Sequence, residues 1–131
     1  MSKVAVVTGA SAGVGRAVVR EYARRGYDVA LIARGHDGLD AARAEVEACG
    51  RRALVLPTDV ADEAAVEAAA ERAEAELGPI DVWTNVAFSN VFAEFTELTP
   101  QEYRRITEVS YLGYVYGTMS ALKRMLPRDR G

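Results

Sequence analysis

Three glycines in one short segment have the spacing that most clearly indicates chemistry in this 131-residue chain. Gly9, Gly13 and Gly15 follow an apolar, β-branched run and precede a helical pattern. The first glycine permits a turn that a Cβ would block, and the other two allow an anion to approach and the helix to pack closely. A helix N-terminus adds free N–H groups and a partial positive charge. The segment predicts a phosphate-binding loop; the alternative is a plain tight turn.

The spacing of these glycines narrows the class of phosphate site. It does not match Gly-x-Gly-x-x-Gly, and no Gly-Lys-Ser/Thr follows, which disfavours a P-loop nucleotide hydrolase. The loop joins a strand to a helix, which is where dinucleotides bind in open α/β sheets.

The elements that must position this loop alternate between short apolar runs and longer helical patterns. We expect strands at 4–8, 28–33, 53–56 and 80–87, and helices at 14–25, 39–49, 63–77 and 100–125. Four strands that are each followed by a helix predict an open α/β fold, a parallel sheet with helices on both faces. Ligands bind such sheets beyond the carboxyl ends of the strands, which points to the loops 8–16, 33–38, 57–61 and 85–95.

Two capping signals mark where helices begin. Asp62 is expected to cap the helix at 63–77, and Thr99, Pro100 and Glu102 form a capping-box pattern before the last helix. The second half of that last helix is apolar nearly all round, so we expect more than one of its faces to be covered.

Composition and charge exclude several classes of function. The net charge is −3, from 16 basic and 19 acidic residues, without the basic excess of a nucleic-acid binder. No apolar run approaches the ~18 residues of a membrane span, and Val4–Val7 is too short for a signal peptide. Cys49 and His36 are single residues of their types, so we expect no disulfide and no metal site. Together these features predict a cytoplasmic protein.

Several motifs in order resemble those of the short-chain dehydrogenases/reductases. Thr-Gly-x-x-x-Gly-x-Gly at 8–15 is similar to their cofactor loop, and Thr-Asp-Val at 58–60 to their adenine-contacting pair. Ile-Asp-Val at 80–82, with Asn85 and Ala87, resembles the fourth strand and its Asn-Asn-Ala-Gly ending. The middle of their long fifth helix resembles Val-Ser-x-x-Gly at 109–113, and the lead-in to their fifth strand resembles 125–131.

This resemblance implies a Rossmann-like, doubly wound parallel sheet of about four strands with flanking helices, incomplete at the C-terminus. Residues 1–131 would form one dinucleotide-binding domain, the N-terminal part of a longer domain. The expected cofactor-binding residues are Gly9, Ser11, Gly13, Val14, Gly15, Arg34, Asp59, Val60, Asn85 and Ala87. Asn85 and Ala87 would line the ribose end of the cofactor, whereas Asp59 has an alternative role as a turn former.

Arg34 determines which nicotinamide cofactor we expect. It follows the second strand, 19 residues after Gly15, where an acidic residue would bind ribose hydroxyls and an arginine can pair with a 2′-phosphate. The nearest carboxylate, Asp37, comes three residues later. We therefore expect NADP rather than NAD; the alternative is that Arg34 is a solvated charge at a strand end.

The chain lacks the acid/base pair of this family. The resemblance implies hydride transfer between the nicotinamide and a carbonyl or alcohol carbon, with a Tyr as acid/base and a Lys four positions later. Met119 stands four residues before Lys123, and no tyrosine has a lysine four residues on. Val86 and Phe88 depart from the family pattern, and Ser110 replaces the helix Asn as the one catalytic candidate. The chain alone is expected to be inactive.

Two main hypotheses follow, and a third is structural. The chain is either the cofactor-binding half of an NADP-dependent oxidoreductase of small molecules or a stand-alone, non-catalytic dinucleotide-binding or protein-interaction module. A nucleotide-independent structural domain is the third reading. Four strands would leave the fourth as an open edge, with apolar surface at Val82, Trp83 and 109–122, so we expect a homo-oligomer. No nucleic acid or membrane partner is expected.

Overall fold

Four parallel strands form one sheet in the computed structural model, which describes residues 2–131. The strands are β1 (Lys3–Thr8), β2 (Tyr27–Ala33), β3 (Ala53–Pro57) and β4 (Val82–Thr84), in the order β3-β2-β1-β4. β1 lies inside the sheet because it pairs with β2 on one side and β4 on the other. The strand order reverses between β1 and β4, and such a reversal opens a crevice at the carboxyl ends of the two strands.

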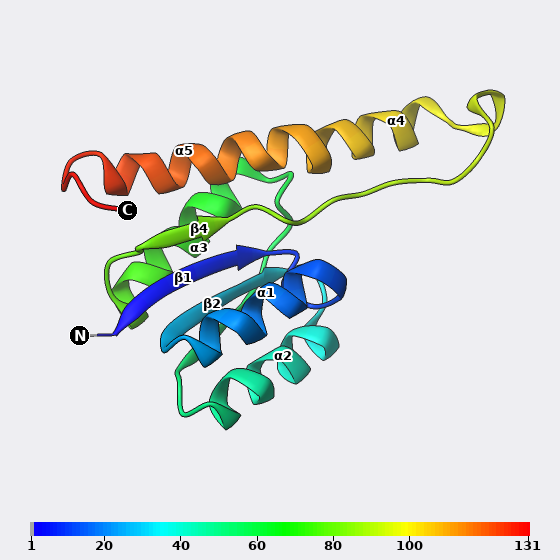
Figure 1. Cartoon of the computed structure of the whole chain (residues 1–131). Helices are drawn as coiled ribbons and strands as arrows, with labels where there is room; N and C mark the ends of the chain where they lie inside the picture. The colour runs from blue at the N-terminus through cyan, green and yellow to red at the C-terminus, as the bar shows by residue number, and fades with distance from the viewer. Residues whose placement is uncertain (1) are drawn as a thin grey trace.

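Helices cover both faces of the sheet (Figure 1). The helices α1 (Gly13–Arg24) and α2 (His36–Ala48) bury apolar residues against one face, which includes Val7 and Leu31. On the other face, which includes Val6 and Ile32, α3 (Glu63–Leu77) and the partly buried Tyr116 of α5 (Gly113–Met125) pack. Alternate side chains of each strand therefore enter two separate cores, as the period of a strand requires. This arrangement confirms the Rossmann-like, doubly wound α/β fold.

The expected helix caps are present. Asp62 accepts a hydrogen bond from the Ala65 N–H (3.1 Å), and Thr99 and Glu102 form the capping box that begins α4 (Pro100–Thr107). The single helix expected at 100–125 is interrupted, because α4 passes into a π-helical turn, η2 (Glu108–Leu112), before α5 begins.

The fourth strand is shorter than the expected 80–87. The Ile80 N–H binds the Glu74 carboxylate (2.7 Å) instead of a neighbouring strand. Beyond Thr84 the backbone leaves the sheet, and the N–H groups of Val86 and Ala87 bind the Thr8 hydroxyl (2.9 and 3.2 Å). Side chains therefore take the place of a strand neighbour at both ends of this run.

An arm formed by α4 and the segment before it extends beyond the sheet (Figure 1). The short 3-10 turn η1 (Phe95–Glu97) lies in this arm, where Phe95 packs against Tyr103 with ring centroids 5.4 Å apart. No residue of α4 is buried. The apolar core therefore does not hold the arm in place.

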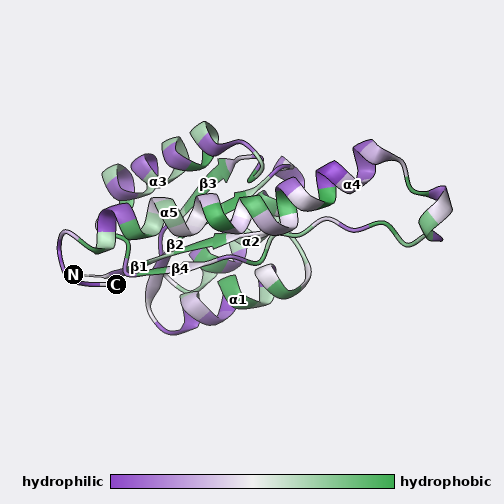
Figure 2. Ribbon diagram, turned by 90° about the horizontal axis from the view of Figure 1, so that it is seen from above, coloured by the Kyte–Doolittle hydropathy of each residue, from purple (hydrophilic) through white to green (hydrophobic). Residues whose placement is uncertain are grey.

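α5 packs against α3 and β4, and one of its faces is exposed. Met119 and Leu122 are 57% and 44% exposed, and no element of residues 2–131 lies over them. Figure 2 shows hydrophobic residues along α5, whereas α4 is largely hydrophilic. β4 ends the sheet, and its Val82 and Trp83 are half-buried. Among residues 2–131, no helix combines the length and apolar character needed to cross a membrane.

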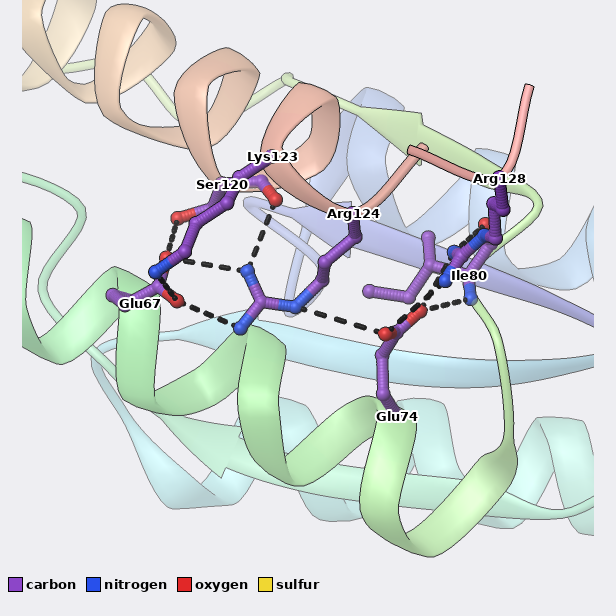
Figure 3. Close-up of polar contacts among 7 residues, drawn as sticks. All are labelled: Glu67, Glu74, Ile80, Ser120, Lys123, Arg124 and Arg128. Atoms are coloured by element: carbon purple, nitrogen blue, oxygen red, sulfur yellow. Dashed lines mark hydrogen bonds and ion pairs between the residues drawn. The ribbon is translucent and has the colours of Figure 1, made fainter. Parts of the chain in front are cut away.

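A carboxylate of α3, Glu67, holds α5 through charged hydrogen bonds (Figure 3). Glu67 accepts hydrogen bonds from the Arg124 guanidinium (2.7 Å), the Ser120 hydroxyl (2.8 Å) and the Lys123 ammonium (3.1 Å). The Arg124 hydrogen bond, with those of Ser120 and Lys123, lowers the pKa of Glu67 to about 2 although partial burial opposes this shift. The carboxylate therefore stays ionised throughout the pH range in which most proteins are folded.

A second carboxylate of α3, Glu74, holds the chain after α5. It accepts a hydrogen bond from the Arg128 guanidinium (2.7 Å) and lies 3.8 Å from the Arg124 guanidinium (Figure 3). Arg128 also donates to the Ile80 carbonyl (2.8 Å). Burial raises the pKa of Glu74, but the hydrogen bonds from Arg128 and from the Ile80 N–H hold it below the ordinary value.

The first prediction concerns the acid stability that Glu67 confers. Its pKa is about 2 in the folded protein and ordinarily near 4.5, so its contribution is complete above pH ~4.5 and is lost as pH falls toward 2. We expect Glu67→Gln to lower the free energy of unfolding at pH 7 by about 1 kcal/mol, because a third of this side chain is exposed and screened. Urea denaturation of the full-length protein at pH 7, 4 and 3 measures both effects.

Glu71→Gln is the matched control for this prediction. Glu71 lies one helical turn from Glu67 on α3, is exposed, and makes no hydrogen bond or ion pair with any of residues 2–131. Its substitution should change the free energy of unfolding by less than about 0.5 kcal/mol. Equal losses for the two variants would contradict a specific contribution of Glu67.

Candidate cofactor-binding site

A cavity of about 510 Å³ lies at the carboxyl ends of the strands, where the strand order reverses. Nine of the ten expected cofactor-binding residues line it: Gly9, Ser11, Gly13, Val14, Gly15, Arg34, Asp59, Val60 and Ala87. Four separate loops supply these residues, so the sheet brings together positions that are up to 78 residues apart in the sequence. Their contacts with a cofactor stay predictions.

The glycine loop is shaped by two close backbone approaches. Gly9 has a φ of +68°, and a Cβ at this position would lie 2.8 Å from the Ala87 nitrogen. A Cβ on Gly15 would overlap the carbonyl oxygen of Gly9. Both positions therefore require glycine, the first for its conformation and the second for space. These contacts set α1 directly against the end of β1.

The N-terminus of α1 forms one wall of the cavity. α1 begins at Gly13, its first turn contains no acidic residue, and no side chain caps it. Helix geometry leaves the first N–H groups without intrahelical acceptors, and the helix dipole adds a partial positive charge. Gly13, Val14 and Gly15 line the cavity with this end of the helix. The wall suits a phosphate group.

Arg34 contributes a cation to the same cavity. It is exposed, lines the cavity, and has no ion-pair partner among residues 2–131. Of the 14 arginines of the chain, all but Arg34 and Arg104 form an ion pair within these residues. An unpaired arginine at a cavity wall can form charge-assisted hydrogen bonds with a phosphate.

Asp59, which also lines the cavity, forms a bidentate ion pair. Arg105 of α4 donates to both carboxylate oxygens, at 2.8 and 3.0 Å, and the Ala61 N–H donates at 3.0 Å. The Arg105 hydrogen bonds, and the more distant charge of Arg34, lower the pKa of Asp59 against the effect of burial. The carboxylate is therefore an ionised acceptor beside the cavity.

Two side-chain hydroxyl groups bind the backbone of the loop after β4. The buried Thr8 hydroxyl accepts hydrogen bonds from the Val86 and Ala87 N–H groups. Ser110 accepts a hydrogen bond from the Ser89 N–H (3.1 Å) and donates one to the Ser89 carbonyl (3.0 Å). Ser110 thus links η2 to this loop and does not line the cavity. Its catalytic role stays a prediction.

Asn85 lies outside the lined cavity, although we expected it at the ribose end of the cofactor. Its side-chain oxygen accepts a hydrogen bond from the Trp83 indole (2.9 Å), and its amide nitrogen donates to the Thr118 hydroxyl (3.2 Å). Gly117 provides the space for this contact, because a Cβ there would overlap the Asn85 side chain. Asn85 joins β4 to α5 in this structure, and its contact with a cofactor stays a prediction.

Two lining residues, Arg105 and Val109, lie outside the loops that the sequence predicts to bind a ligand, whereas Ser89 lies within the predicted loop 85–95. Arg105 lies 46 residues from Asp59, and no local pattern pairs them. Val109 belongs to the Val-Ser-x-x-Gly motif, in which only its neighbour Ser110 has a predicted role. Phe88, which departs from the family pattern, lines the cavity and is 74% exposed. It adds an apolar surface at the mouth of the site.

The family model described as short chain dehydrogenase matches residues 3–131. The chain belongs to this family. The match covers the glycine loop, the strands and the long helix, so it includes the residues that line the cavity. Residues 2–131 contain no group of three His, Cys, Asp or Glu side chains that could hold a metal ion.

Individual relatives of the chain act on different molecules. It is 41% identical over 132 residues to cis-4-hydroxycyclohexanecarboxylate dehydrogenase of Sinomonas cyclohexanicum, covering 98% of this chain and 52% of that protein. It is 37% identical over 129 residues to glycine betaine reductase of Emericella nidulans, covering 98% of this chain and 10% of that protein. The chain therefore spans about half or less of the length of these relatives.

Solved structures show the same architecture. The crystal structure of an actinorhodin polyketide ketoreductase variant with NADPH has a TM-score of 0.93 and 31% sequence identity. The match covers 99% of this chain and 51% of that one. The strands and helices of the present chain thus superpose on half of an enzyme that was solved with a dinucleotide.

The second prediction concerns the contact between Gly15 and Gly9. Gly15→Ala should lower the free energy of unfolding by at least about 3 kcal/mol, because its Cβ meets backbone that cannot move aside without disturbing the strand. Gly35→Ala, in the same cavity but facing open space, should cost less than about 1 kcal/mol. Urea denaturation of both variants measures the difference. Similar stabilities would mean that α1 can move away from β1.

Proposed function

We propose that this chain forms the cofactor-binding half of an NADP-dependent short-chain oxidoreductase. The observation that carries the proposal is that the unpaired Arg34 and the N-terminus of α1 line the same cavity. A phosphate at each of these two places matches a dinucleotide with an additional 2′-phosphate. The NADPH that accompanies the actinorhodin ketoreductase structure supports this choice. NAD is the less favoured cofactor.

In this proposal, different residues bind different parts of the cofactor. Ser11, Gly13, Val14 and Gly15 would hold the pyrophosphate at the start of α1, with Gly9 shaping the turn, and Arg34 would bind the 2′-phosphate. Asp59 and Val60 would contact the adenine at one end of the cofactor. Ala87 would face the ribose that carries the nicotinamide at the other end. The bound nicotinamide supplies hydride chemistry, and these residues bind and orient it.

The proposed substrate is a small molecule with a carbonyl or alcohol group. Phe88 would offer it an apolar surface at the mouth of the cavity. The chain contains no Tyr-x-x-x-Lys, and its one polar candidate, Ser110, is engaged by Ser89. The relatives of known name are about twice as long or longer. We therefore place the proton-transferring residues in the other half and expect these 131 residues alone to be inactive.

A stand-alone, non-catalytic dinucleotide-binding or protein-interaction module is the second candidate function. Three departures from the family pattern favour it: Val86 and Phe88 in the segment that resembles Asn-Asn-Ala-Gly, and Ser110 in place of the helix Asn. In the family these positions lie near the reacting atoms. The exposed apolar side chains of α5 and the open edge of β4 support a homo-oligomer under either function. We also propose a cytoplasmic location, consistent with the single cysteine.

The third prediction tests the choice of cofactor. Arg34→Gln should weaken NADPH binding by about tenfold or more, because a charged hydrogen bond to phosphate contributes about 1.5–3 kcal/mol. NADH lacks the 2′-phosphate, so its dissociation constant should change little. Quenching of Trp83 fluorescence during titration of the full-length protein gives both constants. Equal losses for NADPH and NADH would contradict the assignment.

Arg104→Gln is the matched control for Arg34→Gln. Arg104 is the other arginine without an ion pair among residues 2–131, is exposed, and does not line the cavity. Its substitution removes the same charge from the protein at a different place. NADPH should bind this variant as it binds the wild type, so a shared loss would point to general electrostatics.

The mass of the protein in its own cells separates the two candidate functions. A mass near 14.2 kDa would favour the stand-alone module, whereas about twice that mass or more would favour the oxidoreductase half. Intact-mass spectrometry of the protein captured from those cells gives the answer. A Ser and a Tyr-x-x-x-Lys in the additional sequence would supply the missing chemistry.

A further inference from the structure

The strongest unassigned feature is the ion pair that joins the arm to the cavity. Arg105 reaches from α4 to Asp59, which lies in the loop after β3. Both residues line the cavity, and both are about one third exposed. Neither charge is therefore forced into a pair by deep burial. The two parallel hydrogen bonds fix the orientation of the carboxylate as well as its charge.

The hydrogen bonds that the Asp59 carboxylate already accepts show which of its acceptor positions are free. An ionised carboxylate offers about four acceptor positions, two on each oxygen. Oδ1 accepts hydrogen bonds from the Ala61 N–H (3.0 Å) and from Arg105 Nη2 (3.0 Å). Oδ2 accepts a hydrogen bond from Arg105 Nη1 (2.8 Å) and, within residues 2–131, from no other donor. One oxygen thus keeps an acceptor position at the cavity wall.

The same ion pair is the polar attachment of α4 to the sheet. Within residues 2–131, the other side-chain hydrogen bonds of α4 stay within residues 99–107. None of the residues of α4 is buried, and the arm extends beyond the sheet in Figure 1. Asp59 therefore serves two parts of the molecule, the wall of the cavity and the base of the arm.

We propose that Arg105 is a positioning residue for the adenine end of the cofactor, and that it couples occupancy of this end to the order of α4. This role rests on the proposed function. Arg105 would hold the Asp59 carboxylate so that the free acceptor position of Oδ2 faces the exocyclic amino group of adenine. An amine donates to that acceptor, whereas the carbonyl at the same place in hypoxanthine repels it. An adenine bound to Asp59 would in turn restrict the motion of Asp59, and through the ion pair that of Arg105 and α4.

The fourth prediction compares two cofactors that differ only in the base: hypoxanthine has a carbonyl in place of the exocyclic amino group of adenine and an N–H in place of the adjacent ring nitrogen. NADPH and the reduced nicotinamide hypoxanthine dinucleotide phosphate are titrated into the full-length wild type and into Arg105→Gln. NADPH should bind the variant about tenfold more weakly, whereas the hypoxanthine analogue should change by less than about twofold. Arg105→Lys should restore part of the difference, because lysine keeps the charge but not the two parallel hydrogen bonds.

Arg104→Gln again serves as the matched control, because it removes the neighbouring charge of the same helix. It should leave the dissociation constants of both cofactors unchanged. Thermal unfolding without cofactor separates a folding defect in Arg105→Gln from a loss of binding. If that variant does not fold, Arg105→Lys carries the comparison between the two bases.

Hydrogen exchange gives a readout that does not depend on affinity. Saturating NADPH should slow amide exchange in residues 100–107 of the wild type, and should do so much less in Arg105→Gln. Equal weakening of both cofactors, unchanged binding or tighter binding in Arg105→Gln would overturn the inference while leaving the proposed function intact. A wild type that binds neither cofactor would overturn both.

Discussion

The close approach of the backbone between β1, α1 and the end of β4 is the constraint on which the site depends. Gly15 places the start of α1 on the Gly9 carbonyl, and Gly9 in turn lies against Ala87. The Thr8 hydroxyl holds the same end of β4 through two backbone N–H groups. The contacts of Gly15 with Gly9 and of Gly9 with Ala87 involve backbone on both sides, and backbone cannot change rotamer. Walls built from such backbone contacts favour preorganisation, which reduces the entropy lost on binding.

Most of the arginines form ion pairs within residues 2–131, several of which join different elements, whereas Arg34 and Arg104 form none. At the amino ends of the strands, the fully buried Asp28 is held by Arg51 and Arg52. Burial alone would raise the pKa of Asp28, but its hydrogen bonds from Arg52 and Arg51 keep it below the ordinary value. Arg34 differs from Arg104 because it lines the cavity, so it is the unpaired arginine that places a positive charge there.

Local patterns predicted the elements well and the detailed contacts less well. The capping box at Thr99 and the cap at Asp62 were recognisable because each involves residues three positions apart. The contacts of the Asn85 side chain were not recognisable, because the space for them comes from Gly117 on a distant helix. The π-helical turn at 108–112 also left no periodic signal, since one additional residue in a helix barely shifts its apolar stripe.

By itself the sequence determined the order of strands and helices, the glycine loop and the charge at position 34. These follow from short-range physics: side-chain periodicity, backbone freedom and the absence of a Cβ. Only the tertiary structure decided that Asp59 meets Arg105, that Ser110 binds Ser89 and that Asn85 faces α5. Each of these contacts joins residues 21 to 46 positions apart. The sheet brings such residues together, and no spacing along the chain specifies which donor will meet which acceptor.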